Sequence, residues 1–401
     1  MTESKSVLLA YSGGLDTSYL VAWLTNEKGF DVTTLTVDCG GFDDDAKREL
    51  ESRALAFGAK KHLCIDSRST MFERVLRWLI AGNVRRGGTY PLCVAAERGL
   101  QAEILAATAK QHNIGIVAHG CTGAGNDQVR FEAALAIVAD DLEVLAPVRD
   151  NAVSREEERA YLEKHNLPLP PAGGQYSINA GLWGVTIGGG AMHSSEGPLP
   201  EDAWEWTRDG QGEGVVEIGF RGGVPESLDG VSFDSVTLIE TLNRVAGGLG
   251  VGRGYHLGDT ILGFKGRIAF EAPAAEVLLA AHRELEKLVL VEDQRFWKDQ
   301  LGDVYGRQLH RGMLHDPFLR DLEAFFASTQ ERVNGTVRVR MNAGNVLVEG
   351  LDSPNSMLSA SGTAYGERLS SESNPAAALG LAHAMAEPAR LVRKSEAGAG
   401  V

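Results

Sequence analysis

Near its N-terminus the chain reads Val7-Leu8-Leu9-Ala10-Tyr11-Ser12-Gly13-Gly14-Leu15-Asp16-Thr17-Ser18, an apolar run that meets a serine, two glycines and an aspartate. The pattern predicts a buried strand, a tight turn and then an amphipathic helix. Glycine lets the backbone approach an oxyanion closely and adopt angles that other residues avoid. The hydroxyl groups of Ser12, Thr17 and Ser18 would then point at the same place as the amide groups that open the helix. This arrangement predicts an anion cradle at a helix N-terminus.

Asp16 is the unusual member of this run, because a carboxylate beside phosphate groups repels them. Its presence makes sense if it holds Mg²⁺ or orients a hydrogen-bond donor. The run lacks the Gly-Lys-Ser/Thr of a Walker loop. A plain strand-to-helix turn would also use glycine for geometry and serine as a cap. The complete run resembles the pyrophosphate loop of the N-type ATP pyrophosphatases, which split ATP between the α and β phosphates.

The composition is that expected of a soluble globular protein, with 43% hydrophobic and 23% charged residues among 401. A net charge of −15 argues against a broad nucleic-acid-binding surface. No apolar run approaches the roughly 18 residues that span a membrane, and residues 1–6 lack a signal-peptide core. The four cysteines lack metal-ligand spacing and indicate reduced thiols. We therefore expect a cytoplasmic protein that binds neither nucleic acid nor a membrane.

Short apolar runs alternate with helical patterns over the first part of the chain. The predicted strands are 7–10, 32–37, 62–65, 114–118 and 144–146, and the predicted helices are 19–28, 43–57, 70–84, 94–112 and 154–165. Such alternation predicts an α/β fold with a doubly wound parallel sheet. The resemblance of the first loop to that of the ATP pyrophosphatases implies the adenine nucleotide α-hydrolase-like type of this fold. Ligands of such sheets bind at the carboxyl ends of the strands. Three motifs follow strand ends: Ser12–Ser18, Val37–Gly41 and His119–Arg130.

The pattern changes after a segment rich in proline and glycine, residues 168–174. Residues 180–230 are Gly-rich and loop-like apart from a strand at 215–220. Further on, the pattern predicts helices at 235–246, 274–291 and 318–330, and a hairpin over 336–348. We expect three parts: an ATP pyrophosphatase nucleotide-binding domain at 1–170, an α+β synthetase domain at 171–357, and a C-terminal segment at 358–401 with a helix at 375–386.

A second Gly-rich turn follows the predicted strand 114–118 and again opens a helix. It carries Thr122, Asn126, Asp127 and Arg130 within the run His119–Glu132. Threonine and asparagine side chains can bond a carboxylate or an amine, an aspartate can take an ammonium, and arginine offers a bidentate fork to a carboxylate or polarised carbonyl. The alternative explanation is purely structural: a capped helix start with an aspartate and an arginine on the surface.

Together the two loops closely resemble those of the argininosuccinate synthase family, and the resemblance extends over most of residues 7–350. Its motifs are Tyr11–Ser18, Tyr90-Pro91-Leu92, Ala118–Glu132, Ala146-Pro147 with Arg149, Ser154–Glu157, Tyr176-Ser177-Ile178, Leu182-Trp183-Gly184, Val216–Phe220, Leu242-Asn243, Gly250–Arg253, Glu271-Ala272-Pro273 and Thr329–Val333. The segment 358–401 matches poorly. Because the family uses its C-terminal segment to build a tetramer, the resemblance implies a homotetramer or another homo-oligomer.

The resemblance implies a reaction and a role for each matching residue. ATP and Mg²⁺ would adenylate the ureido oxygen of an acceptor, citrulline in the family, and the amine of L-aspartate would then displace AMP. The implied catalytic residues are Asp16, Asp127 and Arg130. ATP would contact Ala10, Tyr11, Ser12, Gly13, Gly14, Asp16, Thr17, Ser18, Val37 and Gly120, with Asp16 also near Mg²⁺ on the ATP phosphates. L-Aspartate would contact Thr122, Asn126 and Asp127, and the acceptor would contact Tyr90, Asn126, Arg130, Ser177 and Thr186, as well as Arg86 if it faces inward.

The chain departs from the family pattern mainly on the acceptor side. The family has a glutamate at the position of Gly188, a glutamate at Gly258 and a tyrosine at Phe270, and this set is expected to grip the ammonium of citrulline. Nearby, Cys93-Val94 replaces Gly-Thr, Arg86-Gly87-Gly88 replaces Tyr-Glu-Gly, and Glu97 stands where the family is apolar. Ala124 replaces a lysine of the second loop.

Two explanations of these departures are open. In the first, which we favour from the sequence, the enzyme ligates aspartate to another acceptor, a ureido, amide or carboxylate compound without an ammonium group. In the second, it is an argininosuccinate synthase of arginine biosynthesis whose pocket has been rebuilt by Glu97, Asp259 or Glu271. Two further classes share the first loop: a tRNA-modifying enzyme, which the charge of −15 disfavours, and a non-catalytic nucleotide-binding homologue.

Overall fold

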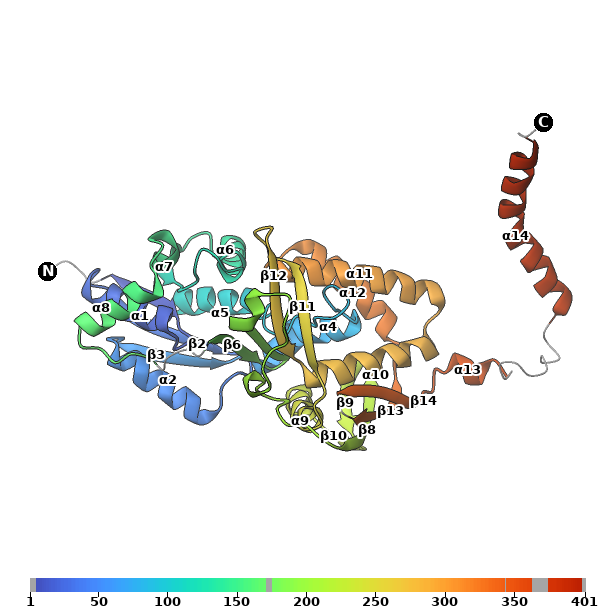
Figure 1. Cartoon of the computed structure of the whole chain (residues 1–401), viewed down its shortest axis with the longest axis horizontal. Helices are drawn as coiled ribbons and strands as arrows, with labels where there is room; N and C mark the ends of the chain where they lie inside the picture. The colour runs from blue at the N-terminus through green and yellow to red at the C-terminus, as the bar shows by residue number, and fades with distance from the viewer. Residues whose placement is uncertain (1–4, 171–174, 343, 363–373, 399–401) are drawn as a thin grey trace. The chain divides into compact units, whose positions relative to one another are not determined.

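The computed structural model describes residues 5–170, 175–342, 344–362 and 374–398. The chain divides into two compact units, Met1–Asn355 and Ser356–Val401. In its described residues, 356–362 and 374–398, the second unit has the helices α13 (Met357–Ala360) and α14 (Pro375–Gly398) (Figure 1). Helix α14 begins where the sequence predicts a helix and continues twelve residues beyond the predicted end at 386. No helix in the described part of the chain is long and apolar enough to cross a membrane.

A five-stranded parallel sheet forms the first part of the larger unit. Its strands, in spatial order, are β3 (Lys61–Asp66), β2 (Asp31–Asp38), β1 (Ser6–Ala10), β4 (Ile116–Ala118) and β5 (Glu143–Leu145). Every neighbouring pair runs parallel, with Leu8 opposite both Thr33 and Val117. All five strands lie within two residues of the predicted ranges, so the predicted parallel sheet is confirmed.

Helices cover both faces of this sheet, as strand alternation requires. Val7 and Leu9 of β1 pack in a core with α1 (Leu15–Asn26), α2 (Asp44–Ala56) and α8 (Arg155–Lys164). Leu8 packs on the opposite face with α5 (Arg98–Gln111) and α6 (Asp127–Val138). Short helical segments complete this part at Arg68–Met71, Phe72–Leu76, Arg77–Ala81 (α4) and Pro147–Asp150 (α7). The doubly wound fold class is therefore confirmed.

The strand order places a switch point between β1 and β4. The chain leaves β1 toward β2 on one side and returns to β4 on the other. The loops that follow two such strands diverge, and they open the crevice in which doubly wound proteins bind ligands. The Ser-Gly-Gly turn follows β1 and the second Gly-rich turn follows β4. The topology therefore brings the two candidate loops to one edge of the sheet.

The remainder of the larger unit is built on two antiparallel sheets. One has the order β10 (Val231–Ser232), β9 (Val224–Leu228), β8 (Glu213–Arg221), β13 (Gly335–Asn342) and β14 (Asn345–Asp352), and the other has the order β11 (Arg253–Asp259), β12 (Lys265–Glu271), β7 (Gly184–Gly189) and β6 (Tyr176–Gly181). Helices α9 (Ser235–Gly248), α10 (Pro273–Val289), α11 (Glu292–His310) and α12 (Pro317–Gln330) accompany them, with short 3-10 turns at Gly190–His193 and Glu201–Ala203. This is the predicted α+β arrangement (Figure 1).

The prediction of loop for residues 180–230, apart from a strand at 215–220, is wrong in two segments: β6 ends and β7 lies within 180–189, and β9 occupies Val224–Leu228. Four glycines occur between 181 and 189, and glycine carries no side-chain signal for a strand. The strands form because β7 pairs with β12 as well as with β6. The sequence also failed to predict helix α11, whose composition is polar and whose apolar positions are few.

One large apolar core joins segments from both sides of the predicted boundary near residue 170. It includes Met71, Phe72 and Val75 of the first part, together with residues of the second such as Trp183 and Leu278. The Trp183 side chain is fully buried, and its Nε1 donates to the carbonyl oxygen of Pro91 at 3.0 Å. Because this contact fixes the Tyr90–Pro91 turn against the second sheet, the acceptor side of the site depends on both parts of the chain. The predicted domain ranges stay a prediction.

Glu271 is a buried anchor of the loop that precedes β8. Its carboxylate accepts bonds from the backbone N–H groups of Glu205, Trp206 and Thr207 and from the Thr207 hydroxyl, at 2.6–2.9 Å. We expect Glu271→Ala to lower the free energy of unfolding by about 3 kcal/mol or more, since each buried donor left unpaired costs about 1–3 kcal/mol. Urea unfolding followed by circular dichroism measures this. Glu205→Gln, an exposed change in the same loop, is the control, and equal stability of the two variants would contradict the assignment.

Candidate active site

The Ser-Gly-Gly turn leads directly into α1 and leaves its N-terminus open. Gly14 is the N-cap and has no side-chain cap, so the first amide groups of the helix have no internal partner. The hydroxyl of Thr17 lies 3.3 Å from that of Ser12 and 3.3 Å from the carbonyl oxygen of Gly14. Asp16 stands in the first turn of the helix. An open helix N-terminus with the hydroxyl groups of Ser12 and Thr17 beside it can receive an anion. The Ser18 hydroxyl is instead fully buried, 3.4 Å from that of Tyr11.

Packing from α2 holds the turn in place. Gly13 has φ +74°, and a Cβ atom there would lie 2.3 Å from Leu50 Cδ2. A side chain at this position would therefore meet both backbone strain and a clash. The guanidinium of Arg53 donates to the Gly13 carbonyl oxygen at 2.8 Å. The turn is thus fixed before any ligand arrives, which reduces the ordering cost of binding.

The second loop lies against the first. A Cβ atom on Gly120 would lie 3.0 Å from Thr17 Cγ2, so glycine permits the close approach of the two loops. Asn126 begins α6 without a side-chain cap, which leaves a second open helix N-terminus at the same edge of the sheet. The Asn126 Oδ1 atom accepts from the backbone N–H of Ile261 at 2.8 Å, which directs the amide nitrogen elsewhere. The turn between β11 and β12 is therefore tied to this loop.

Two arginines share the carboxylate of Asp127. Arg98 Nε lies 2.9 Å from Asp127 Oδ2, and Arg130 Nη1 lies 2.6 Å from Oδ1. Burial opposes ionisation of Asp127, but the charges of Arg98 and Arg130 outweigh it and lower the pKa to about 2. Arg130 Nε also donates to the backbone carbonyl of His310 at 2.8 Å. The cluster is rigid and carries one net positive charge.

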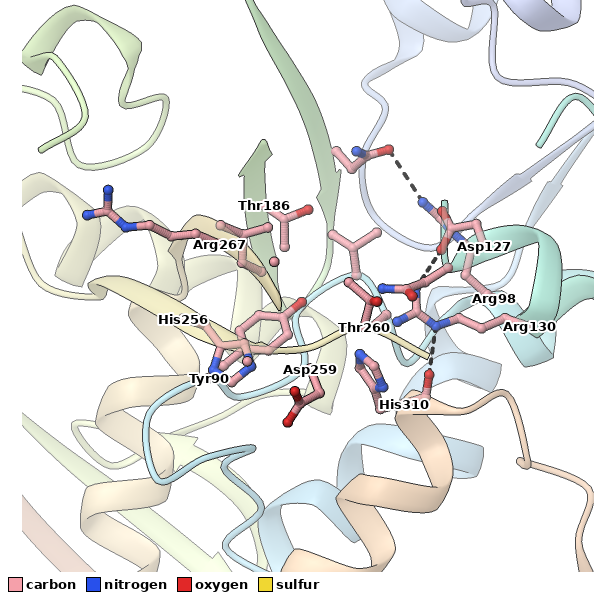
Figure 2. A pocket seen from close by; sticks show the side chains of 17 residues that line it. Tyr90, Arg98, Asp127, Arg130, Thr186, His256, Asp259, Thr260, Arg267 and His310 are labelled. Carbon is pink, nitrogen blue, oxygen red and sulfur yellow. Dashed lines mark hydrogen bonds and ion pairs between the residues drawn. The ribbon is translucent and has the colours of Figure 1, made fainter. Parts of the chain in front are cut away.

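A cavity of about 190 Å³ opens beside this cluster. Its wall includes five residues predicted for the site: Tyr90, Asn126, Asp127, Arg130 and Thr186. Figure 2 shows Arg98, Asp127 and Arg130 on one side and Tyr90 and His256 on the other, with Thr260 and His310 between them. The structure therefore brings these five predicted residues together around one space, which is large enough for a small organic molecule.

Other predicted residues lie outside this wall. Thr122 is exposed in the second loop, and Ser177 is exposed on β6, opposite Gly188 of β7. Arg86 is not part of the wall but contacts a wall residue: its Nη2 donates to the carbonyl oxygen of Asp259 at 2.6 Å. Val37 is half-buried near the end of β2, on the same edge as the first loop.

The departures from the family pattern change the cavity in two places. Gly258 forms part of the wall, and Phe270 is buried against Tyr90 with 5.3 Å between ring centroids. Of the three acidic residues that could replace the lost carboxylates, only Asp259 reaches the wall, and it pairs with Lys265 at 2.6 Å. Glu97 is buried against Gly181, and burial raises its pKa to about 8. The Glu271 carboxylate already accepts hydrogen bonds from the backbone of residues 205–207.

Sequence reasoning missed Arg98, His256 and His310, which all take part in the wall. Arg98 follows the Tyr-Pro-Leu run by six residues, and this proximity is the one local signal for it. His256 and His310 come from β11 and from the end of α11, where no local pattern marks them. Only the tertiary fold brings these residues to the cavity.

The parallel sheet, the open helix N-termini at its switch point and the anion cradle define a nucleotide-binding α/β protein. Comparison with protein families gives the same assignment. Residues 6–168 match the model described as arginosuccinate synthase N-terminal HUP domain, and residues 176–391 match the arginosuccinate synthase C-terminal domain. The chain belongs to the argininosuccinate synthase family.

Curated relatives agree over nearly the whole chain. It is 40% identical to the argininosuccinate synthase of Dictyoglomus turgidum over 376 residues, 92% of this chain and 94% of the relative. It is 38% identical to that of Methanocaldococcus jannaschii over 364 residues, 90% of this chain and 92% of the relative. It is 40% identical to that of Lactiplantibacillus plantarum over 361 residues, which are 88% of this chain and 87% of the relative. The protein is thus an ATP-dependent carbon–nitrogen ligase that uses aspartate and releases AMP and pyrophosphate.

Proposed function

We propose that the enzyme joins L-citrulline to L-aspartate and so forms argininosuccinate. The observation that carries this proposal is about 40% identity to argininosuccinate synthases over nine tenths of the chain. These relatives favour citrulline over the different acceptor that the sequence departures suggested. The anion cradle would bind the pyrophosphate part of ATP, and the cluster of Arg98, Asp127 and Arg130 would bind aspartate. Binding of these two substrates is common to such ligases.

The protein's contribution to the chemistry is alignment and charge stabilisation. The ureido oxygen of citrulline attacks the α phosphorus of ATP, and the bond to pyrophosphate breaks. The open N-terminus of α1 would receive the pyrophosphate charge, because its amide groups have no other partner. The amine of aspartate then attacks the activated ureido carbon, and AMP leaves. Arg130 and Arg98 would hold carboxylate groups near this carbon, while Asp127 would accept from the aspartate ammonium.

The residues around the cradle fit a magnesium ion that is held mainly by ATP. No group of three or more histidine, cysteine or acidic residues in the described chain could hold a metal by itself. Asp16 supplies one carboxylate at the cradle, and buried Glu158 lies near it, with burial and then the Asp16 charge raising its pKa to about 8. Magnesium commonly uses one or two carboxylates together with phosphate oxygens. When bound, it would neutralise the charge that develops on the pyrophosphate.

Pyrophosphate release tests the proposed acceptor. With ATP, Mg²⁺ and L-aspartate, we expect release to depend on L-citrulline and to rise at least about tenfold above the rate without it. The measurement is a coupled pyrophosphate assay on the full chain, with argininosuccinate identified by mass spectrometry. An active enzyme whose rate of pyrophosphate release does not change when citrulline is added would contradict the proposal.

A second acceptor class has one observation in its favour, the positive charge of the cavity wall. Arg98 and Arg130 share a single carboxylate, and the Asp259 carboxylate already pairs with Lys265. An ammonium group would find no unpaired carboxylate among the described wall residues, whereas an acidic group would be attracted. If citrulline fails, ureido or amide acceptors with carboxylates are the next ones to assay. A cytoplasmic location and a homo-oligomeric assembly stay predictions.

A further inference from the structure

Arg86 is a cation beside the cavity that has no acidic partner in the described part of the chain. Its Nη2 donates to the Asp259 carbonyl oxygen at 2.6 Å, while its Nε is buried and has no hydrogen-bond partner. The preceding residue, Arg85, is different, because it forms an ion pair with Glu276. A buried guanidinium nitrogen without a partner costs free energy unless a ligand or water satisfies it.

Two histidines near Arg86 line the cavity. His256 stacks on Tyr90 with 5.5 Å between ring centroids, and its Cε1 would lie 3.1 Å from a Cβ atom on Gly87. His310, at the end of α11, is 8% exposed and lines the cavity beside Arg130 (Figure 2). Neither ring donates a hydrogen bond to another described residue, so each can offer an N–H group to a ligand.

The electrostatic surroundings of these three residues are positive. Burial and then Arg130 lower the pKa of Arg86, and Arg307 and Arg311 act in the same sense, against the opposing charge of Asp259. Burial, Arg130, Arg86, His256 and Arg311 together lower the pKa of His310 to about 3. Burial and then Arg86 lower that of His256. The positive charge that disfavours protonation of these rings would favour a bound anion.

We propose that His256 and His310, on the wall of the acceptor cavity, and Arg86, beside that wall, form an anion-binding subsite, which takes a carboxylate or phosphate group. Such a group has two possible sources, an acidic substituent of the acceptor itself or a free inorganic anion that regulates the site. As part of the acceptor site, the subsite rests on the proposed function, whereas anion binding by itself does not require turnover.

Isothermal titration of the full chain separates the two sources. The probes are inorganic phosphate and N-carbamoyl-L-glutamate, a ureido compound with two carboxylates. We expect at least one probe to bind wild-type protein, and Arg86→Gln to weaken that binding about tenfold or more, as expected for a lost charge-assisted contact. Arg86→Lys should weaken it less, because the charge remains. Arg307→Gln, which removes a nearby exposed charge, is the matched control and should change the affinity by less than about threefold.

The probe whose affinity falls in Arg86→Gln identifies the kind of group that the subsite binds. An Arg86-dependent affinity confined to N-carbamoyl-L-glutamate assigns the subsite to an acceptor-borne acid, and one shared by phosphate assigns it to a free anion. Equal binding of both probes by wild type and Arg86→Gln, or no binding by wild type, would overturn the subsite. His310→Asn should weaken the same probe, which guards against misfolding of the Arg86 variants. Arg86-dependent binding without citrulline-dependent pyrophosphate release would refute only the proposed function.

Discussion

Replacing Asp16 with alanine is expected to abolish ligation and leave the fold intact. Asp16 is the one carboxylate in the first turn of α1, at the open end of the helix that receives phosphate groups in our account. Loss of charge control at a phosphoryl-transfer site lowers kcat by roughly a hundredfold to a thousandfold or more. The measurement is pyrophosphate release with saturating ATP, aspartate and citrulline.

The stability of this variant should change little, because two small effects oppose each other. Losing an acidic residue from the first turn costs about 0.3–1 kcal/mol of helix stabilisation. Removing Asp16 also lowers the cost of ionising the buried carboxyl of Glu158, whose pKa is raised by burial and then by the Asp16 charge. A thermal melt within a few degrees of wild type would confirm the fold, and Asp45→Ala, an exposed change in α2, is the matched control. Wild-type turnover by Asp16→Ala would refute its assigned role.

Replacing Asp127 with alanine should damage both activity and stability. Arg98 and Arg130 are 14% and 7% exposed as side chains, so the change would leave two nearly buried guanidinium groups without their shared carboxylate. Removing one partner of a fully buried ion pair costs about 3–5 kcal/mol, and since the Asp127 side chain is 39% exposed we expect a smaller loss of about 1–3 kcal/mol. We also expect a higher KM for aspartate, because the predicted ammonium contact is lost.

Two measurements separate these effects. Urea unfolding gives the loss in stability, and initial rates at varied aspartate concentration give the KM. Asp141→Asn is the control, since its carboxylate pairs with Lys110 on the surface and is 61% exposed. Such exposed pairs contribute little to stability because water and salt screen them. A stable Asp127→Ala enzyme with an unchanged KM for aspartate would contradict the role of the cluster.

The parallel sheet could be predicted from the sequence because its signals are local. Buried strands such as 7–10 are continuous apolar runs, and the helices between them show their own periodicity. The spatial order of the strands is seen only in the structure, where it places the loops after β1 and β4 together. The sequence assigned both loops to one site because each follows a strand end and because both resemble loops of one family.

The acceptor wall could be predicted only in part. Tyr90 and Thr186 were found through family motifs, whereas β6 and β7 were missed because glycine conceals strand periodicity. His256 and His310 reach the cavity through a hairpin and a helix end distant in sequence from both loops. The sequence also could not show that Glu97 turns toward Gly181 instead of the cavity. Such directions depend on tertiary packing.

Transfer of an isotope label tests the central claim most directly. L-Citrulline carrying ¹⁸O in the ureido group is incubated with the enzyme, ATP, Mg²⁺ and L-aspartate, and the AMP is analysed by mass spectrometry. If the ureido oxygen is adenylated and aspartate then displaces AMP, the AMP formed carries the label and equals the argininosuccinate produced. Pyrophosphate release that yields unlabelled AMP would contradict the account.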